Sequence, residues 1–208
     1  VRNTFLYTVL TVAGFIILGL LIAIALNKNT KIHSFMQSVA FAPHIISLVS
    51  ISMLWLWLMD YDYGLFNYLL GKIGAGPVSF LTNPDIVMYS LAAVSIWKGV
   101  GYYSLIFLSG LQAIPDDIYE AAALDNTPWH RKLFKITLPM LSPTVFFIGI
   151  TSIIASFKVF ETISIMTQGG PMNASNTLVY YIYETGFKFF NMGLSSAAGV
   201  IPVSYTHL

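Results

Sequence analysis

The 208-residue chain contains no cysteine and has few charged side chains. Only 9% of its residues are Asp, Glu, Lys or Arg, whereas 56% are hydrophobic. A typical soluble domain has about 25% charged residues, so this composition excludes an ordinary cytosolic enzyme and a basic nucleic-acid-binding protein. The absence of cysteine excludes a disulfide framework, a thiol nucleophile and a cysteine metal site. The composition therefore indicates a membrane protein.

Long uncharged stretches separate the few charges. There are 25 uncharged residues between Arg2 and Lys28, and 28 between Lys31 and Asp60. About 20 predominantly apolar residues cross the hydrocarbon core of a membrane as a helix. We therefore predict an all-α, polytopic membrane protein with four full spans and a shorter fifth one. The predicted spans are 4–26, 36–59 with a kink at Pro43, 86–111, 140–166 and 189–203.

The connections between the spans differ in composition. Residues 60–85 are rich in Gly and Pro, which predicts a loop with at most one short amphipathic helix. Residues 167–188 contain Gln168-Gly169-Gly170-Pro171, which predicts a turn. Basic residues near the span ends are more numerous in loops 27–35 and 112–139 than on the other side, so we place these two loops in the cytoplasm.

Both ends of the sequence resemble cut points. An apolar run begins almost at residue 1, and the last span is too short to cross a bilayer. After it, the sequence turns abruptly polar. We expect a single transmembrane domain over 1–203, incomplete at both ends and followed by a non-native tail at 204–208. No function is assigned to His207.

The loop 112–139 has the most informative pattern. It contains seven of the nineteen charges of the chain. Pro115 and the two aspartates that follow it are typical of a helix N-terminus. Asn126 suits the left-handed residue that ends a helix, and Thr127 is predicted to cap a second helix beginning at Pro128. The loop is therefore predicted to form two short helices with a sharp break.

The first of these helices has the features of a docking surface. Three alanines follow Glu120. Small side chains let another surface approach the backbone closely, and a single carboxylate can pair with an Arg or Lys of a partner. We therefore predict that a second protein binds here.

These residues also resemble a known family. Glu120-Ala121-Ala122, then Asp125, then Ile136-Thr137-Leu138-Pro139 resemble the Glu-Ala-Ala loop of permease subunits of binding-protein-dependent ABC importers. Five other stretches resemble the maltose and glycerol-phosphate types of these permeases. The one that begins at Thr167 is typical of the larger of two paired permeases. The five stretches are Asn3-Thr4, Gly64-x-x-Asn67, Trp97-Lys98-x-x-Gly101, Gly110-Leu111-Gln112-x-Ile114-Pro115 and Thr167-x-Gly169-Gly170-Pro171. The chain departs from the family pattern at Asn126, where Gly is usual.

The resemblance implies a type I ABC importer permease fold in the plasma or inner membrane. The loop would be the coupling helix, seated on a dimer of ABC ATP-binding subunits. The expected coupling residues are Glu120, Ala121, Ala122, Asp125, Asn126, Ile136, Leu138 and Pro139. The other implied partners are a second related permease, an extracytoplasmic solute-binding protein, membrane lipid and a sugar substrate, with no nucleic acid.

No catalytic or cofactor site is expected in this chain. It lacks a Gly-rich phosphate loop ending in Gly-Lys-Ser/Thr, so ATP would be bound and hydrolysed by a partner polypeptide. No metal site is expected either, because His33, His44 and His130 lack metal-ligand spacing.

Lys98 is the most unusual residue of the third span. It lies roughly 18 Å into the span at 1.5 Å per residue, where a charge is costly unless it faces a cavity or a partner. It could hydrogen-bond sugar hydroxyls or make a structural pair. This region lines the sugar site in maltose-type permeases. The resemblance therefore implies a substrate path that consists of Lys98, Gly99, Tyr102, Tyr103, Ser152 and Ser156. The alternative role of these residues is packing within the protein.

Two other functions remain open from the sequence. The chain could be an ABC permease for another solute, such as glycerol phosphate, a peptide or an amino acid. A phosphate-carrying solute would favour an unpaired Lys98 in the path. An ion-driven secondary transporter is less favoured, because it predicts an inverted repeat that the sequence does not show.

Overall fold

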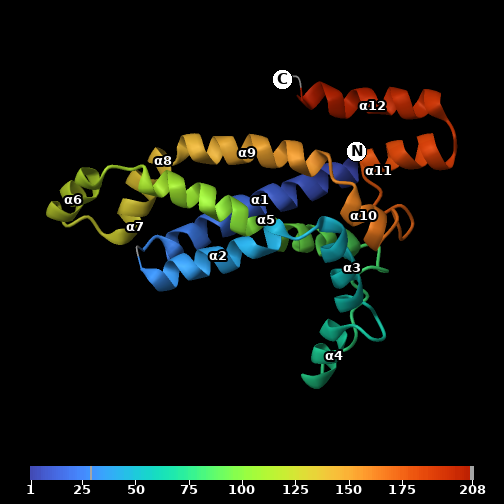
Figure 1. The fold of residues 1–208 in the computed structure, drawn as a ribbon, viewed down its shortest axis with the longest axis horizontal. Helices are drawn as coiled ribbons and strands as arrows, with labels where there is room; N and C mark the ends of the chain where they lie inside the picture. Colours follow the sequence, from blue (N-terminus) through green and yellow to red (C-terminus); the bar gives the residue numbers. More distant parts are fainter. Residues whose placement is uncertain (29, 207–208) are drawn as a thin grey trace. The chain divides into compact units, whose positions relative to one another are not determined.

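The structure is a computed structural model that describes residues 1–28 and 30–206, with side chains as far as Pro202. The described residues form helices and no strands (Figure 1). In chain order the helices are α1 (Arg2–Leu26), α2 (Lys31–Ile45), α3 (Leu48–Leu58), α4 (Leu65–Lys72), α5 (Val87–Gln112), α6 (Asp116–Leu124), α7 (Trp129–Lys132), the π-helix η1 (Leu133–Thr137), α8 (Leu138–Met140), α9 (Ser142–Phe157), α10 (Glu161–Met166), α11 (Leu178–Tyr183), the π-helix η2 (Glu184–Lys188) and α12 (Met192–Thr206).

Two of the predicted spans are single long helices. α1 and α5 match the predicted ranges 4–26 and 86–111 to within two residues at each end. Both are long and apolar enough to cross a membrane, and so is the segment Ser142–Met166. The predicted all-α, polytopic membrane fold is confirmed.

The second predicted span is a broken one. It consists of α2 and α3, with a sharp bend at the break. The predicted position of the bend is Pro43, but this residue lies inside α2. The break falls at Ile46 and Ser47 instead. A proline removes a backbone donor and crowds the preceding turn of a helix, but α2 continues through Pro43 as far as Ile45.

The last two predicted spans also differ from expectation. The fourth is interrupted between Phe157, where α9 ends, and Glu161, where α10 begins. The fifth begins at Met192, three residues later than predicted, whereas its apolar part is shorter than a full span, as predicted. Residues 158–160, between α9 and α10, are not helical, and two of these, Val159 and Phe160, are β-branched and aromatic residues of lower helix propensity.

The outer connections contain more structure than the sequence predicts. α4 is the one short helix expected in 60–85. The turn at Gln168 is confirmed, since Gln168 and Gly169 have φ angles of 49° and 81°. The last part of this connection, residues 178–188, is helical and forms α11 and η2. The Thr4 hydroxyl accepts the Leu178 N–H at 2.9 Å and so holds the start of α11.

The described chain divides into two compact units. The first consists of Val1–Val12, Ile46–Trp97 and Ile153–Leu208, and the second of Ala13–Ile45 and Lys98–Ser152. The predicted single domain over 1–203 stays a prediction. The predicted tail at 204–208 also stays a prediction, since residues 207–208 and the side chains from Val203 onward lie outside the described residues.

The first unit has a continuous apolar core. Residues of α3, α5 and α10 meet there with Tyr7 and Tyr180, which are almost fully buried. The Tyr7 hydroxyl donates to Ser95 Oγ at 2.6 Å, so its polar end is satisfied within the core.

The second unit is held together by close helix approaches. A Cβ added at Gly101 of α5 would lie 1.8 Å from the backbone oxygen of Ala40 in α2. A Cβ at Gly110 would lie 2.6 Å from the hydroxyl of Thr144 in α9. Glycine is required at Gly101 because no larger residue lets the two backbones approach so closely.

Candidate functional site

The loop after α5 has the predicted helix–break–helix form. The first helix is α6, with Asp116 and Asp117 in its first turn. Asn126 has a φ of 50°, as predicted for the residue that ends this helix. The Asn126 and Thr127 N–H groups donate to the carbonyls of Ala123 and Ala122, both at 3.0 Å. This is the paired hydrogen-bond pattern of a Schellman helix end.

The second helix of the loop differs from the prediction. It begins at Trp129, and its N-cap residue is Pro128, without a side-chain cap. The predicted capping role of Thr127 is therefore wrong. The helix then widens into η1, and the next turn is α8. The Tyr119 and Thr137 hydroxyls hydrogen-bond at 3.2 Å and join α6 to η1.

The loop exposes Glu120 and other charged residues, together with three large apolar side chains. Glu120 and Ala121 are exposed, and Ala122 is buried against the loop. Leu124, Trp129 and Phe134 are 85%, 76% and 65% exposed. We call these three side chains together with Glu120 and Ala121 the docking face. Large exposed apolar side chains of this kind are typical of a protein interaction site.

The other predicted coupling residues surround this face. Asp125 is exposed at the end of α6, next to Asn126. Ile136 lies in η1, and Leu138 and Pro139 lie in α8, which leads directly into α9. The loop is therefore connected to a membrane-spanning helix by a nearly continuous run of helical turns.

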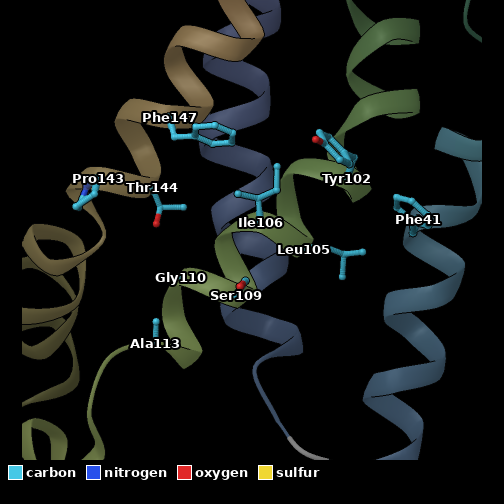
Figure 2. A pocket seen from close by; sticks show the side chains of 10 residues that line it. All are labelled: Phe41, Tyr102, Leu105, Ile106, Ser109, Gly110, Ala113, Pro143, Thr144 and Phe147. Atoms are coloured by element: carbon cyan, nitrogen blue, oxygen red, sulfur yellow. The ribbon is translucent and has the colours of Figure 1, made fainter.

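A cavity of about 610 Å³ lies between α2, α5 and α9 within the second unit. Figure 2 shows Tyr102 and Phe41 at one side of it, and Thr144 and Phe147 of α9 at the other. The lining is apolar with a few hydroxyl groups and no carboxylate or basic side chain. It consists of Phe41, Tyr102, Leu105, Ile106, Ser109, Gly110, Ala113, Pro143, Thr144 and Phe147.

Of the predicted path residues, only Tyr102 lines this cavity. Gly99 and Tyr103 pack on Phe15, with the Tyr103 and Phe15 ring centroids 4.4 Å apart. Ser152 is fully buried and donates to the Gly149 carbonyl at 3.1 Å. In the first unit, the Ser156 hydroxyl hydrogen-bonds that of Thr11 at 2.8 Å. Their transport roles stay predictions.

Several cavity residues have no recognisable signal in the sequence. Phe41, Ser109 and Thr144 are ordinary residues of apolar spans, and only tertiary packing brings them together. Gly110 belongs to one of the family motifs. Its lack of a side chain lets Thr144 of α9 approach α5 at the cavity.

Lys98 hydrogen-bonds the C-terminal end of α2, the first helix of the broken span. Its ammonium group donates to the carbonyl oxygens of His44 at 2.9 Å and Pro43 at 3.4 Å. The last carbonyls of a helix have no partner within the helix, so a donor from another helix is needed to satisfy them. Lys98 thus acts as a cationic cap on α2. The His44 ring in turn stacks on Tyr102, with centroids 4.5 Å apart and planes at 8°.

Replacing Lys98 by Met is therefore expected to destabilise the protein. The variant keeps the chain length but leaves two carbonyls unpaired, which costs about 1–3 kcal/mol. The melting temperature of the purified complex in detergent measures the effect. Lys98→Arg should restore most of the loss, and Lys31→Met, at an exposed lysine of the same unit, should change nothing. Equal melting of Lys98→Met and Lys31→Met would refute the cap.

Comparison with known proteins decides the family. A family described as "Binding-protein-dependent transport system inner membrane component" matches residues 15–205. The chain belongs to this family. The resemblance seen in the sequence motifs is confirmed, and the permease is an inner-membrane component.

Relatives extend this similarity. The permease is 32% identical over 193 residues to the trehalose/maltose transport system permease protein of Thermococcus litoralis, covering 91% of this chain and 65% of the relative. It is 34% identical over 201 residues to an sn-glycerol-3-phosphate transport system permease protein of Agrobacterium fabrum, covering 96% and 68%. The chain thus spans about two thirds of the length of these relatives.

A solved structure supports the fold. A chain in the crystal structure of a bacterial alginate ABC transporter, in complex with its alginate pentasaccharide-bound periplasmic protein, matches with a TM-score of 0.89 and 25% identity. The match covers 99% of the permease and 73% of that chain. The type I ABC permease fold is therefore confirmed, and an ion-driven secondary transporter is not supported.

Proposed function

We propose that the permease is the membrane-spanning subunit of an ATP-driven importer that moves a mono- or oligosaccharide by alternating access. The observation that carries the proposal is the docking face, which lies on α6, α7 and η1 and is linked through α8 to the helix that walls the cavity. Relatives that transport trehalose or maltose support the same function.

The docking face would bind an ATP-binding subunit. Glu120 is exposed and forms no ion pair in the described part of the chain. The salt bridge found there joins Lys188 and Glu184. The Glu120 carboxylate is thus available to a basic residue of a partner. The exposed Leu124 and Trp129 would fill an apolar cleft beside it. ATP binding and hydrolysis belong to that subunit, and the permease itself would need no cofactor.

The cavity favours a neutral sugar over a phosphate ester. Recognition of phosphate requires Arg or Lys, or a set of backbone N–H groups. No basic side chain lines the cavity among the described residues, and the nearby Lys98 is held by two carbonyls. The hydroxyls of Ser109, Thr144 and Tyr102 can instead hydrogen-bond a sugar. We therefore keep glycerol phosphate, a solute of some relatives, as the second candidate.

The rest of the importer would follow the family pattern. A second, related permease would complete the translocation path, and an extracytoplasmic solute-binding protein would deliver the sugar. Selection of the free solute would rest mainly with that binding protein, while the cavity would bind the sugar weakly.

Tyr102 tests the role of the cavity. Tyr102→Ala is expected to lower ATP-driven sugar uptake about tenfold, because an aromatic contact is worth about 1.5 kcal/mol at most. Tyr102→Phe keeps the stack on His44 and should keep most of the uptake. The measurement is the uptake rate of labelled maltose, trehalose and sn-glycerol-3-phosphate by proteoliposomes with the complete transporter. Uptake of glycerol phosphate alone would contradict the sugar assignment, and full uptake by Tyr102→Ala would exclude this cavity from the path.

A further inference from the structure

The short helix α4 is held rigidly in place by one buried side chain. Asn67 is 8% exposed, and its amide donates to the carbonyls of Val78, Tyr61 and Asp60 at 3.0, 3.1 and 3.3 Å. Its side-chain oxygen accepts the Val78 N–H at 2.9 Å. These bonds fix the orientation of α4 relative to the loop on both sides of it, within the first unit.

The approach of the chain to α4 is equally constrained. A Cβ at Gly64, the residue before α4, would lie 2.2 Å from the Asp60 carbonyl oxygen. Asp60 in turn accepts the N–H groups of Asp62 and Tyr63 at 3.0 and 2.8 Å. The turn that leads from α3 into α4 is thus tightly folded, and the surface between these helices has a fixed shape.

A groove of about 490 Å³ lies between the end of α3 and α4. Trp55, Phe66 and Phe80 pack on one another at its base, with ring centroids 5.6 and 6.0 Å apart. Its sides include Leu69 and Ile73, which are 49% and 78% exposed. The lining residues are Trp55, Met59, Phe66, Leu69, Leu70, Lys72, Ile73 and Phe80. A contiguous apolar surface of this kind is expected to be covered in the working protein.

The groove belongs to the membrane interface. α3 is an apolar helix of the broken span and leads towards α4 (Figure 1). Exposed aromatic side chains lie near the end of α3, in the turn after it and in α4. They are Trp57, Tyr61, Tyr63 and Tyr68, which are between 46% and 84% exposed. Trp and Tyr gather where hydrocarbon meets headgroups. The groove is therefore placed at the depth where an acyl chain joins its headgroup.

Lys72 gives the groove a single positive charge. It is the only charged residue among those that line the groove, and its ammonium lies 4.8 Å from the centroid of the Tyr68 ring. The carboxylates of Asp60 and Asp62 line a different hollow, which shares only Met59 and Phe80 with this one. The groove thus combines apolar walls with a single cation and no carboxylate.

We propose that this groove binds one anionic phospholipid of the membrane. An acyl chain lies along Leu69, Ile73 and the aromatic base, and the headgroup phosphate pairs with Lys72. A peptide segment would fit less well, because the lining side chains offer an extended backbone almost no hydrogen-bond partners. A lipid has the required shape, with an apolar chain and one negative charge near its polar end.

Photo-crosslinking of the assembled transporter tests the proposal. The probes are phosphatidylglycerol and phosphatidylcholine with a diazirine in the acyl chain, mixed equally in nanodiscs. Crosslinks are mapped by mass spectrometry to the segment 55–80. We expect about fivefold more phosphatidylglycerol than phosphatidylcholine on this segment, since one lysine near an anionic lipid contributes about that factor.

The variants separate charge from shape. Lys72→Gln should abolish the fivefold preference, Lys72→Arg should keep it, and Lys28→Gln, at an exposed lysine of another loop, should leave it unchanged. Ile73→Asp should reduce crosslinking of both lipids. The proposal is overturned if both lipids label the segment equally, if Lys72→Gln keeps the preference, or if the segment crosslinks to another subunit and to no lipid.

Discussion

Reversing the charge of Glu120 is expected to uncouple transport from ATP hydrolysis. In Glu120→Lys, the ammonium would face the basic residue that we expect on the ATP-binding subunit. Disrupting a charge pair at an interface costs about 2 kcal/mol or more, which weakens docking about thirtyfold. Sugar uptake by proteoliposomes should fall at least tenfold, and ATP hydrolysis should no longer respond to the loaded binding protein.

The position of Glu120 makes this test clean. The side chain is exposed and forms no ion pair within the described chain, so the fold should tolerate the change. Glu120→Gln removes the charge without repulsion and should give an intermediate loss. Lys28→Glu reverses an exposed charge in the loop 27–35, outside the docking face, and should transport normally. Normal uptake by Glu120→Lys would show that the carboxylate has no coupling role.

Adding one methyl group at Gly101 is expected to disrupt the second unit. The new Cβ would lie 1.8 Å from the Ala40 oxygen, 2.5 Å from its carbonyl carbon and 3.0 Å from the Phe41 nitrogen. All three are backbone atoms, so α2 and α5 must separate. Overpacking of this kind costs about 1–3 kcal/mol or more. The separation would also weaken the Lys98 cap and the His44–Tyr102 stack, which lie on the same pair of helices.

Gly149 provides the matched control for Gly101→Ala. It also lies in a membrane helix, but a Cβ there meets nothing within 4 Å. Gly149→Ala should therefore be neutral or slightly stabilising, because Ala favours a helix over Gly. The readouts are the yield of monodisperse complex and its melting temperature, which should drop by about 5 °C or more only in Gly101→Ala. Equal melting temperatures for the two variants would contradict the close packing of α2 on α5.

Local sequence signals predicted the features that depend on local physics. The ends of α1 and α5 follow from long apolar runs, and the helix break at Asn126 follows from its tolerance of a positive φ. Glu120 and its alanines are predicted to bind a partner because they are close together in the sequence, whereas the exposure of Leu124, Trp129 and Phe134 comes from the structure. None of these features needs a contact between distant parts of the chain.

Features that depend on distant contacts were missed. The partners of Lys98 lie 54 and 55 residues away, so neither hydrogen bond is visible in the sequence. The helix α11 depends on Thr4, which is 174 residues from Leu178. Thr127 has the composition of a cap, but the Schellman bond from its N–H to Ala122 fixes it in the preceding helix end.

The family motifs now have physical explanations. Gly101 allows contact with the α2 backbone, Gly110 makes room for Thr144, and Asn67 anchors α4. Asn3 donates to the carbonyls of Asn173 and Asn176 at 2.9 and 3.1 Å and fastens the segment before α11. The motif residues outside the docking face therefore mostly position helices. This explains why the motifs indicate the fold more clearly than they indicate the substrate.

The most direct test of the account is a crosslink between the docking face and the ATP-binding subunit. Because the chain contains no cysteine, Ala121→Cys introduces a single thiol next to Glu120. With a cysteine placed in the cleft of the ATP-binding subunit, oxidation of the assembled transporter should form a disulfide and stop ATP-driven sugar uptake until it is reduced. Ser79→Cys, in the loop 60–85, should form none. Failure of Ala121→Cys to crosslink in a fully active transporter would contradict the proposed coupling.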